Sequence, residues 1–267
     1  MYQFEYQKPG SVADAAALLS KNTDAKLLAG GQTLIASMKL RLASPPVLVD
    51  LSGVKELQGI KLDGGNLVIG AMARHAEVAN SKDVQRSIPA LAKLAGGIGD
   101  RMVRNMGTLG GSVANNDPAA DYPAAVVGLG ATVNTNKRKI AADEFFKGIY
   151  ETALQPGEIL TSIAFPVPKR AAYAKFRNPA SRYAIVGVFV AQGANGVRVA
   201  VTGAAPCVFC VPEMEKALGS RFAADAVAGI KVSANGLNSD MHASAGYRAH
   251  LVTVMAKRAV EAALAGQ

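Results

Sequence analysis

Cysteine is scarce in this sequence, and its scarcity limits the sites that the chain can build alone. The 267 residues include only two cysteines, Cys207 and Cys210, with two residues between them. Two cysteines make no disulfide framework, and an iron–sulfur cluster normally takes four cysteine ligands. A structural zinc site would need two more ligands, and no histidine lies near the pair in sequence. We interpret the pair as buried small hydrophobic residues at a strand end rather than as a redox centre.

Long apolar runs and dense positive charge are also missing. No segment reaches about 18 uninterrupted apolar residues, so no membrane span is expected. The first residues lack the basic-then-apolar pattern of a signal peptide, and we expect a cytoplasmic protein. The formal net charge of +9 favours an anionic partner or cofactor. The Lys and Arg residues are spread along the chain without interleaved aromatic residues, so nucleic-acid binding stays only as a third alternative.

Patterns for metal binding and acid–base catalysis are absent as well. His75, His242 and His250 lie in separate segments, without neighbours spaced as metal ligands. Each is interpreted as a surface or partly packed residue. We therefore predict neither a metal site nor a catalytic residue in this chain.

Hydrophobic periodicity, in contrast, is present along most of the chain and predicts both helices and strands. A first helix begins after Ser11, a capping residue that precedes an apolar face. Further helices are predicted at residues 84–94, 119–129, 212–218, 223–228 and 243–265. Strands are predicted at residues 26–29, 47–49, 67–69, 132–135, 159–165, 185–191 and 197–201. A proline-rich boundary lies at 166–170, so the pattern predicts an α+β fold with units 1–170 and 171–267.

Two adjacent glycines follow the first predicted strand. The segment reads Leu28-Ala29-Gly30-Gly31-Gln32-Thr33-Leu34. Glycine allows positive φ angles and close approach of the backbone to a ligand. Successive N–H groups can then cradle a pyrophosphate, to which Thr33 adds a hydroxyl. A plain tight turn is the alternative for this pair taken alone.

A second segment rich in glycine and small polar residues runs from residue 107 to 121. It contains Thr108-Leu109-Gly110-Gly111-Ser112, whose glycines are expected to expose backbone N–H groups. The side chains of Thr108, Ser112 and Asn115 can add hydrogen bonds, and Asp121 is an acceptor suited to a ribose hydroxyl or a ring N–H. An ordinary surface connection is the alternative. Two such segments in one chain favour a phosphate-bearing cofactor.

The spacing of these glycines excludes the two best-known phosphate-binding motifs. Neither segment has the Gly-x-Gly-x-x-Gly spacing of a Rossmann dinucleotide site, and no Gly-x-x-x-x-Gly-Lys-Ser/Thr P-loop occurs. A cofactor would therefore be held by a different fold.

The two segments together resemble the FAD-binding medium subunits of the xanthine dehydrogenase and carbon monoxide dehydrogenase family of molybdenum hydroxylases. The likeness continues at residues 98–101, 157–160 and 175–187, and covers essentially the whole chain. It implies a vanillyl-alcohol-oxidase (PCMH) type FAD-binding domain over residues 1–170, with subdomains of about 1–52 and 53–170. Residues 171–267 resemble the small C-terminal domain of carbon monoxide dehydrogenase flavoproteins.

The resemblance also implies contacts with non-covalent FAD. In the family the first segment wraps the pyrophosphate and the second closes from the other side. Asp121 matches a carboxylate near the flavin, Lys175 a basic residue near it, and Tyr183 an aromatic residue that covers one face of the ring. The implied cofactor-binding residues are Leu28, Ala29, Gly30, Gly31, Gln32, Thr33, Leu34, Ile98, Gly99, Thr108, Leu109, Gly110, Gly111, Ser112, Asn115, Asp121, Leu160, Lys175 and Tyr183.

By resemblance, the chain is expected to be the electron-transfer flavoprotein subunit of an oxidoreductase. A small subunit would supply iron–sulfur clusters and a large subunit the molybdenum pterin, in a dimer of heterotrimers. The flavin would pass electrons to a quinone, NAD or oxygen. The alternative is a stand-alone FAD-dependent oxidase or reductase with its own substrate pocket, for which no acid or base beside the flavin is evident.

Overall fold

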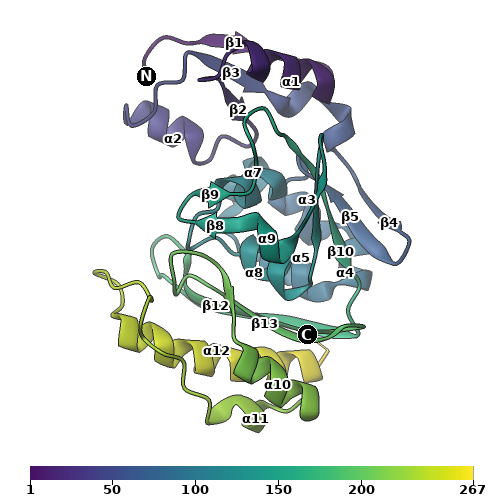
Figure 1. Ribbon diagram of the computed structural model, residues 1–267, viewed down its shortest axis with the longest axis vertical. Coiled ribbons are helices and arrows are strands. Elements are labelled where there is room, and N and C mark those ends of the chain that lie inside the picture. Colours follow the sequence, from purple (N-terminus) through teal and green to yellow (C-terminus); the bar gives the residue numbers. More distant parts are fainter. Residues whose placement is uncertain (267) are drawn as a thin grey trace.

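Three sheets with their helices lie in succession along the long axis of the molecule (Figure 1). The computed structural model describes residues 1–266. The mixture of helices and strands confirms the predicted α+β class. Within the described residues, no helix is long and apolar enough to cross a membrane.

The N-terminal layer is a three-stranded parallel sheet with the order β1-β3-β2. Its strands are β1 (Glu5–Gln7), β2 (Lys26–Leu28) and β3 (Val47–Asp50). Helix α1 (Val12–Lys21) begins as predicted at Ser11, whose side chain accepts a hydrogen bond from the Asp14 N–H at 3.0 Å. Helix α2 (Leu34–Lys39) follows the first glycine segment, and two 3-10 turns, Leu51–Gly53 and Lys55–Leu57, lead out of the layer.

The middle layer is a five-stranded antiparallel sheet packed against short helices. The strand order is β4-β5-β10-β6-β7. Its strands are β4 (Ile60–Asp63), β5 (Asn66–Gly70), β6 (Thr132–Thr135), β7 (Lys139–Ala141) and β10 (Leu160–Pro166), with a small separate pair β8 (Phe146–Gly148) and β9 (Glu151–Thr152). Its helices are α3 (His75–Asn80), α4 (Lys82–Ser87), α5 (Pro89–Gly96), α6 (Arg101–Met106), α7 (Leu109–Asn115), α8 (Tyr122–Gly128) and α9 (Ala142–Phe145).

The C-terminal layer is a four-stranded antiparallel sheet with helices on its outer side (Figure 1). Its strands are β11 (Arg170–Arg177), β12 (Ala184–Gly193), β13 (Gly196–Thr202) and β14 (Phe209–Cys210). Its helices are α10 (Pro212–Ser220), α11 (Ala224–Ala228) and α12 (Ala245–Leu264). The buried Arg248 of α12 donates to the carbonyl oxygens of Ile185 and Gly203, which ties the long helix to the sheet.

The division of the chain into domains at residue 170 stays a prediction. Strand β10 ends at Pro166 and β11 begins at Arg170. The two strands belong to different sheets. Phe189 and Ala200 of the C-terminal sheet are nevertheless buried in the core of the middle layer. The second and third layers therefore share part of one hydrophobic core.

Two predicted elements in the middle layer were wrong in their bounds. The single helix predicted at 84–94 is two helices, because Ile88 precedes a proline and takes a non-helical conformation with φ −141°. The helix predicted from residue 119 begins only at Tyr122, because Asp117 accepts from the Ala119 N–H in a turn.

The second glycine-rich segment is partly helical, which the sequence analysis did not predict. Residues Leu109–Asn115 form helix α7, with Thr108 as its N-cap. Glycine disfavours helices in isolation, but here tertiary contacts stabilise the turn. The hydroxyl of Thr108 accepts from the Gly111 N–H at 3.1 Å, and the Gly110 N–H donates to the Ala71 carbonyl at 2.8 Å.

Candidate functional site

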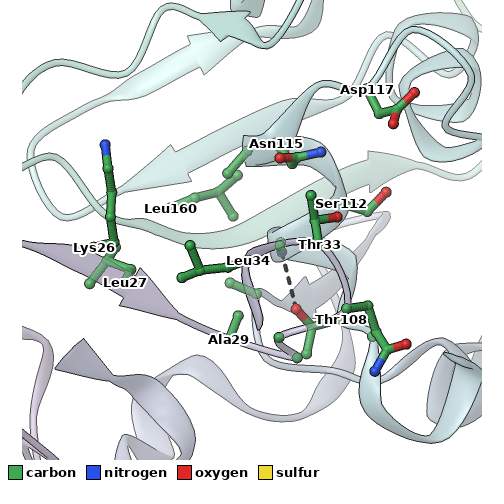
Figure 2. A pocket seen from close by; sticks show the side chains of 18 of the residues that line it. Lys26, Leu27, Ala29, Thr33, Leu34, Thr108, Ser112, Asn115, Asp117 and Leu160 are labelled. Carbon is green, nitrogen blue, oxygen red and sulfur yellow. Dashed lines mark hydrogen bonds between the residues drawn. The ribbon is translucent and has the colours of Figure 1, made fainter. Parts of the chain in front are cut away.

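A cavity of about 1010 Å³ lies where the three layers meet. The N-terminal layer contributes the segment 29–34, the middle layer contributes α7 and the start of β10, and the C-terminal layer contributes residues 181–183. Figure 2 shows side chains of Leu34, Leu160 and Asn115 around the cavity, from three segments distant in sequence. A volume of this size is enough for a large organic cofactor.

The cavity brings together most of the residues predicted to bind the cofactor. All of them line it except Leu28, Leu109 and Lys175. Leu28 belongs to β2, and Leu109 is fully buried in the core of the middle layer. Lys175 lies on β11, where its side chain is occupied by other protein groups.

The first glycine segment leaves a row of backbone donors free. Among the described residues, the N–H groups of Gly30, Gly31, Gln32 and Thr33 donate to no acceptor. Gly31 has φ +71°, a conformation that favours glycine. The residues of this row line the cavity, so they can donate to an anionic group such as a pyrophosphate.

The second glycine segment works differently from the prediction, which had its N–H groups exposed. The N–H groups of Leu109 and Gly110 donate to the carbonyl oxygens of Ala73 and Ala71, and that of Ser112 to Thr108. A Cβ at Gly110 would lie 2.5 Å from the Cβ of Ala71, so this glycine permits close packing of α7.

Side chains rather than backbone groups are therefore the free polar atoms of α7. Within the described residues, the side chains of Ser112 and Asn115 make no hydrogen bond, and both residues line the cavity (Figure 2). They face a site that also includes the free N–H row of residues 30–33. Polar groups of this kind fix the orientation of a bound molecule.

The two glycine segments touch each other directly. A Cβ at Gly30 would lie 2.2 Å from the carbonyl oxygen of Met106 and 2.7 Å from the Cα of Gly107. Real Cβ atoms do not approach backbone so closely, so only glycine at position 30 allows this contact without a shift of one segment.

Asp121 lines the cavity and is almost completely buried, with 4% of its surface exposed. One carboxylate oxygen accepts from the Tyr173 hydroxyl, and the other accepts from Lys175 Nζ at 2.9 Å. Burial raises the pKa of Asp121, while the charge of Lys175 and both hydrogen bonds oppose that rise.

Tyrosine side chains mark the edge of the cavity. Tyr183, predicted to cover the flavin, is half-exposed and lines the cavity. Tyr150 lines it too, although the sequence did not single it out. Its φ of 56° is unusual for an aromatic residue, and its hydroxyl donates to Asp117 at 3.3 Å. Nothing in the sequence around Tyr150 indicates this backbone conformation or the position of its side chain at the cavity.

His75 was also missed, and its interpretation as a surface or partly packed residue was wrong. It is 4% exposed, lines the cavity and packs closely against Gly107. Burial and the nearby charge of Arg104 lower the pKa of His75 to about 4, so the imidazole is neutral at physiological pH. The Arg-His pair at the start of α3 gave no sign of this burial.

Among residues 1–266, neither metal ligands nor the two cysteines form a second candidate site. Within the described residues, no group of three or more His, Cys, Asp or Glu side chains could hold a metal ion. Cys207 and Cys210 are free and partly exposed, where burial was predicted. Burial still raises the pKa of Cys210 to about 12, which makes it a poor nucleophile at neutral pH.

Comparison with known families and proteins gives matches over the whole chain. Residues 2–168 match the family described as the FAD binding domain in molybdopterin dehydrogenase. The carbon monoxide dehydrogenase medium chains of Hydrogenophaga pseudoflava and Afipia carboxidovorans are 35% and 37% identical. The matches cover 98% of this chain in both cases, and 98% and 97% of the relatives. The nicotine 6-hydroxylase medium subunit of Paenarthrobacter nicotinovorans is 35% identical, over 96% of this chain and 95% of its own.

Solved structures give the same result. A chain of carbon monoxide dehydrogenase from Hydrogenophaga pseudoflava superposes with a TM-score of 0.90 at 35% identity, covering 99% of this chain and 98% of that one. A chain of quinoline 2-oxidoreductase from Pseudomonas putida 86 superposes with a TM-score of 0.89 at 30% identity, with the same coverage.

Proposed function

This chain belongs to the family of FAD-binding domains of molybdopterin dehydrogenases, and from that premise we propose that it is the FAD-carrying electron-transfer subunit of a molybdenum hydroxylase. The observation that carries the proposal is the row of free N–H groups at residues 30–33, opposite the free side chains of Ser112 and Asn115 in one cavity. A row of backbone donors suits the pyrophosphate of a dinucleotide.

The cavity fits FAD in other respects. Segment 29–34, with Ser112 and Asn115, would hold the pyrophosphate and adjoining groups without a covalent bond. Asp121 retains lone pairs for an N–H or hydroxyl donor, since each oxygen accepts one hydrogen bond from the protein. The ring would be surrounded by Ile98, Gly99, Leu160 and Tyr183. The close contact of Gly30 with Met106 fixes the position of the first glycine segment relative to the second.

Bound FAD supplies reversible electron transfer, while the protein supplies binding and orientation. The chain's own residues bind the cofactor, orient it and exclude water from it. His75, neutral because its pKa is about 4, adds no charge near the site. This role needs no proton donor or nucleophile, and the sequence analysis predicted no catalytic residue in this chain.

The names of the relatives support a multi-subunit complex. The relatives are named as medium chains or subunits of dehydrogenases and hydroxylases, and one similar solved structure is described as a Cu,Mo-CO dehydrogenase. We propose a small iron–sulfur subunit and a large molybdenum subunit as partners, in a cytoplasmic dimer of heterotrimers. Relatives named for carbon monoxide, nicotine, glyceraldehyde and caffeine share this subunit type, so we propose that the molybdenum subunit selects the substrate.

Purification from the native host with a tag on this chain tests the proposal. We expect two additional chains on a gel and absorbance bands of both flavin and iron–sulfur clusters. A colourless monomer that takes up no FAD contradicts the proposal. An isolated FAD-loaded chain that turns over a substrate without partners would instead support the stand-alone alternative.

A further inference from the structure

Lys175 has no hydrogen bond left for a cofactor. An ammonium group has three N–H donors. Lys175 Nζ donates to Asp121 at 2.9 Å, to the Arg182 carbonyl at 3.0 Å and to the Gly97 carbonyl at 3.1 Å. Its side chain is 10% exposed, and the residue does not line the cavity. A direct contact of this ammonium group with the flavin would break one of these three bonds.

The three acceptors of Lys175 lie in or directly beside three different parts of the cavity wall. Asp121 and Arg182 line the cavity, and Gly97 directly precedes the lining residues Ile98 and Gly99. These acceptors are 54, 78 and 7 residues from Lys175 in the sequence. One buried ammonium group therefore joins elements of the middle and C-terminal layers.

Two arginines also bind backbone carbonyl oxygens of the 97–99 segment. Arg104 donates to the carbonyl oxygens of Ile98 and Gly99 at 2.9 and 3.1 Å, and Arg182 donates to that of Gly99 at 3.2 Å. With Lys175 on Gly97, three successive carbonyls accept from cationic side chains. Among the described residues, the Gly99 N–H meets no acceptor, and Gly99 has φ +48° and lines the cavity.

Tyr173 donates to the other carboxylate oxygen of Asp121, and its position depends on a neighbouring glycine. A Cβ at Gly187 on β12 would lie 2.2 Å from the Tyr173 hydroxyl oxygen. Glycine at this position therefore lets the ring lie across the adjacent strand and reach Asp121. Burial raises the pKa of Tyr173 well above its usual value, so the hydroxyl remains a donor. Tyr173 does not line the cavity.

We propose that Lys175 and Tyr173 are positioning residues, which fix the Asp121 carboxylate, the 97–99 segment and the turn bearing Tyr183 around the flavin without touching it. This inference rests on the proposed function, because it presumes that the cavity holds FAD. It corrects the expectation that Lys175 is itself a cofactor contact.

Three variants of the full chain test the proposal: Lys175→Met, which keeps most of the stem and removes all three donors, Tyr173→Phe, and the double variant. The exposed Lys139 on β7 gives a matched control, Lys139→Met. FAD affinity is measured by flavin fluorescence, the ring environment by visible circular dichroism, and the midpoint potential of the bound flavin by redox titration. Far-ultraviolet circular dichroism and melting report folding.

We expect Lys175→Met to weaken FAD binding at least about tenfold, the effect of losing one or two buried hydrogen bonds. Tyr173→Phe should alter the visible circular dichroism and the potential, although residue 173 does not line the cavity. The two effects should be non-additive, because both side chains act through Asp121. Lys139→Met should match the wild type.

Wild-type affinity, spectrum and potential in Lys175→Met would overturn the inference. So would wild-type flavin signals in Tyr173→Phe, or fully additive effects of the two substitutions, because a lysine that contacted the flavin directly would act independently of Tyr173. If Lys175→Met does not fold, Tyr173→Phe alone decides, because its flavin signals must change. A wild-type chain that binds no FAD would refute the proposed function, whereas normal wild-type binding with unchanged variants would refute only this inference.

Discussion

His75 shows how one buried side chain links stability to pH. Its pKa is about 4 in the folded protein against 6.5 in a solvated histidine. Between pH 6.5 and 4, the unfolded chain therefore binds a proton at this residue that the folded chain does not bind. The contribution of His75 to the free energy of unfolding is fully present above pH 6.5 and is lost as the pH falls towards 4. The shift corresponds to about 3 kcal/mol as an upper value.

We expect His75→Gln to flatten this dependence. Denaturant unfolding between pH 4 and 7.5 measures it, with the exposed His250→Gln as the matched control. Other titrating groups contribute equally to all three proteins, so the difference between variants isolates residue 75. A His75→Gln curve parallel to the wild type across this window would show that the imidazole is not buried in a neutral form.

Gly30 illustrates a different kind of single-residue constraint. A Cβ there would lie 2.2 Å from the Met106 carbonyl oxygen, so Gly30→Ala must push the two glycine segments apart. We expect a loss of about 1–3 kcal/mol of stability, typical of overpacking, and a larger loss of FAD affinity because the donor row moves. Gly59→Ala is a control for the loss of glycine itself, since its Cβ would meet open space, although its φ of +95° adds strain. Unchanged FAD titration in Gly30→Ala would contradict the direct contact.

Sequence patterns revealed some of these residues and missed others for physical reasons. The Gly-Gly pair after β2 was recognisable because strand, glycine and hydroxyl are consecutive. The partners of Lys175 were not, because they are brought together by tertiary packing over distances of up to 78 residues. The burial of His75 and the positive φ of Tyr150 likewise depend on neighbours distant in sequence.

At the scale of elements, α7 shows where the prediction from propensity failed. Its sequence contains two glycines, which disfavour a helix, yet it forms because Thr108 caps it and Ala71 accepts from its first turn. The strands that were predicted and the C-terminal helices agreed with the structure within a few residues. The other strands were not predicted: β1, β4, β7, β8, β9, β11 and β14.

The cap of α7 gives a prediction at this scale. Thr108→Ala removes the acceptor of the Gly111 N–H, so we expect a loss of about 1 kcal/mol in the free energy of unfolding. Because Ser112 and Asn115 project from the same short helix, FAD affinity should fall as well. Thr108→Ser keeps the hydroxyl and should retain most of both. Equal stability of the alanine and serine variants in urea would rule out a capping role.

At the scale of the whole molecule, the cavity is formed by all three layers, so its ligand should stabilise them together. A ligand that binds only the folded state adds about 2.7 kcal/mol at a hundredfold excess over its Kd. We therefore expect FAD to raise the melting temperature in a concentration-dependent way. Hydrogen exchange should slow in residues 29–34, 108–121 and 181–183, one segment from each layer. Protection confined to one layer would contradict a site shared by three.

The contact between Gly30 and Gly107 also constrains how this protein can diverge or be recombined. A side chain at residue 30 collides with the backbone at Met106 and Gly107, and a Cβ at Gly107 would lie 2.5 Å from the ring of His75. Substitutions at these positions are therefore sterically coupled, although more than seventy residues separate the two glycines. A chimera that takes its N-terminal layer from a relative with a bulkier residue at this point would also have to take that relative's α3 and α6.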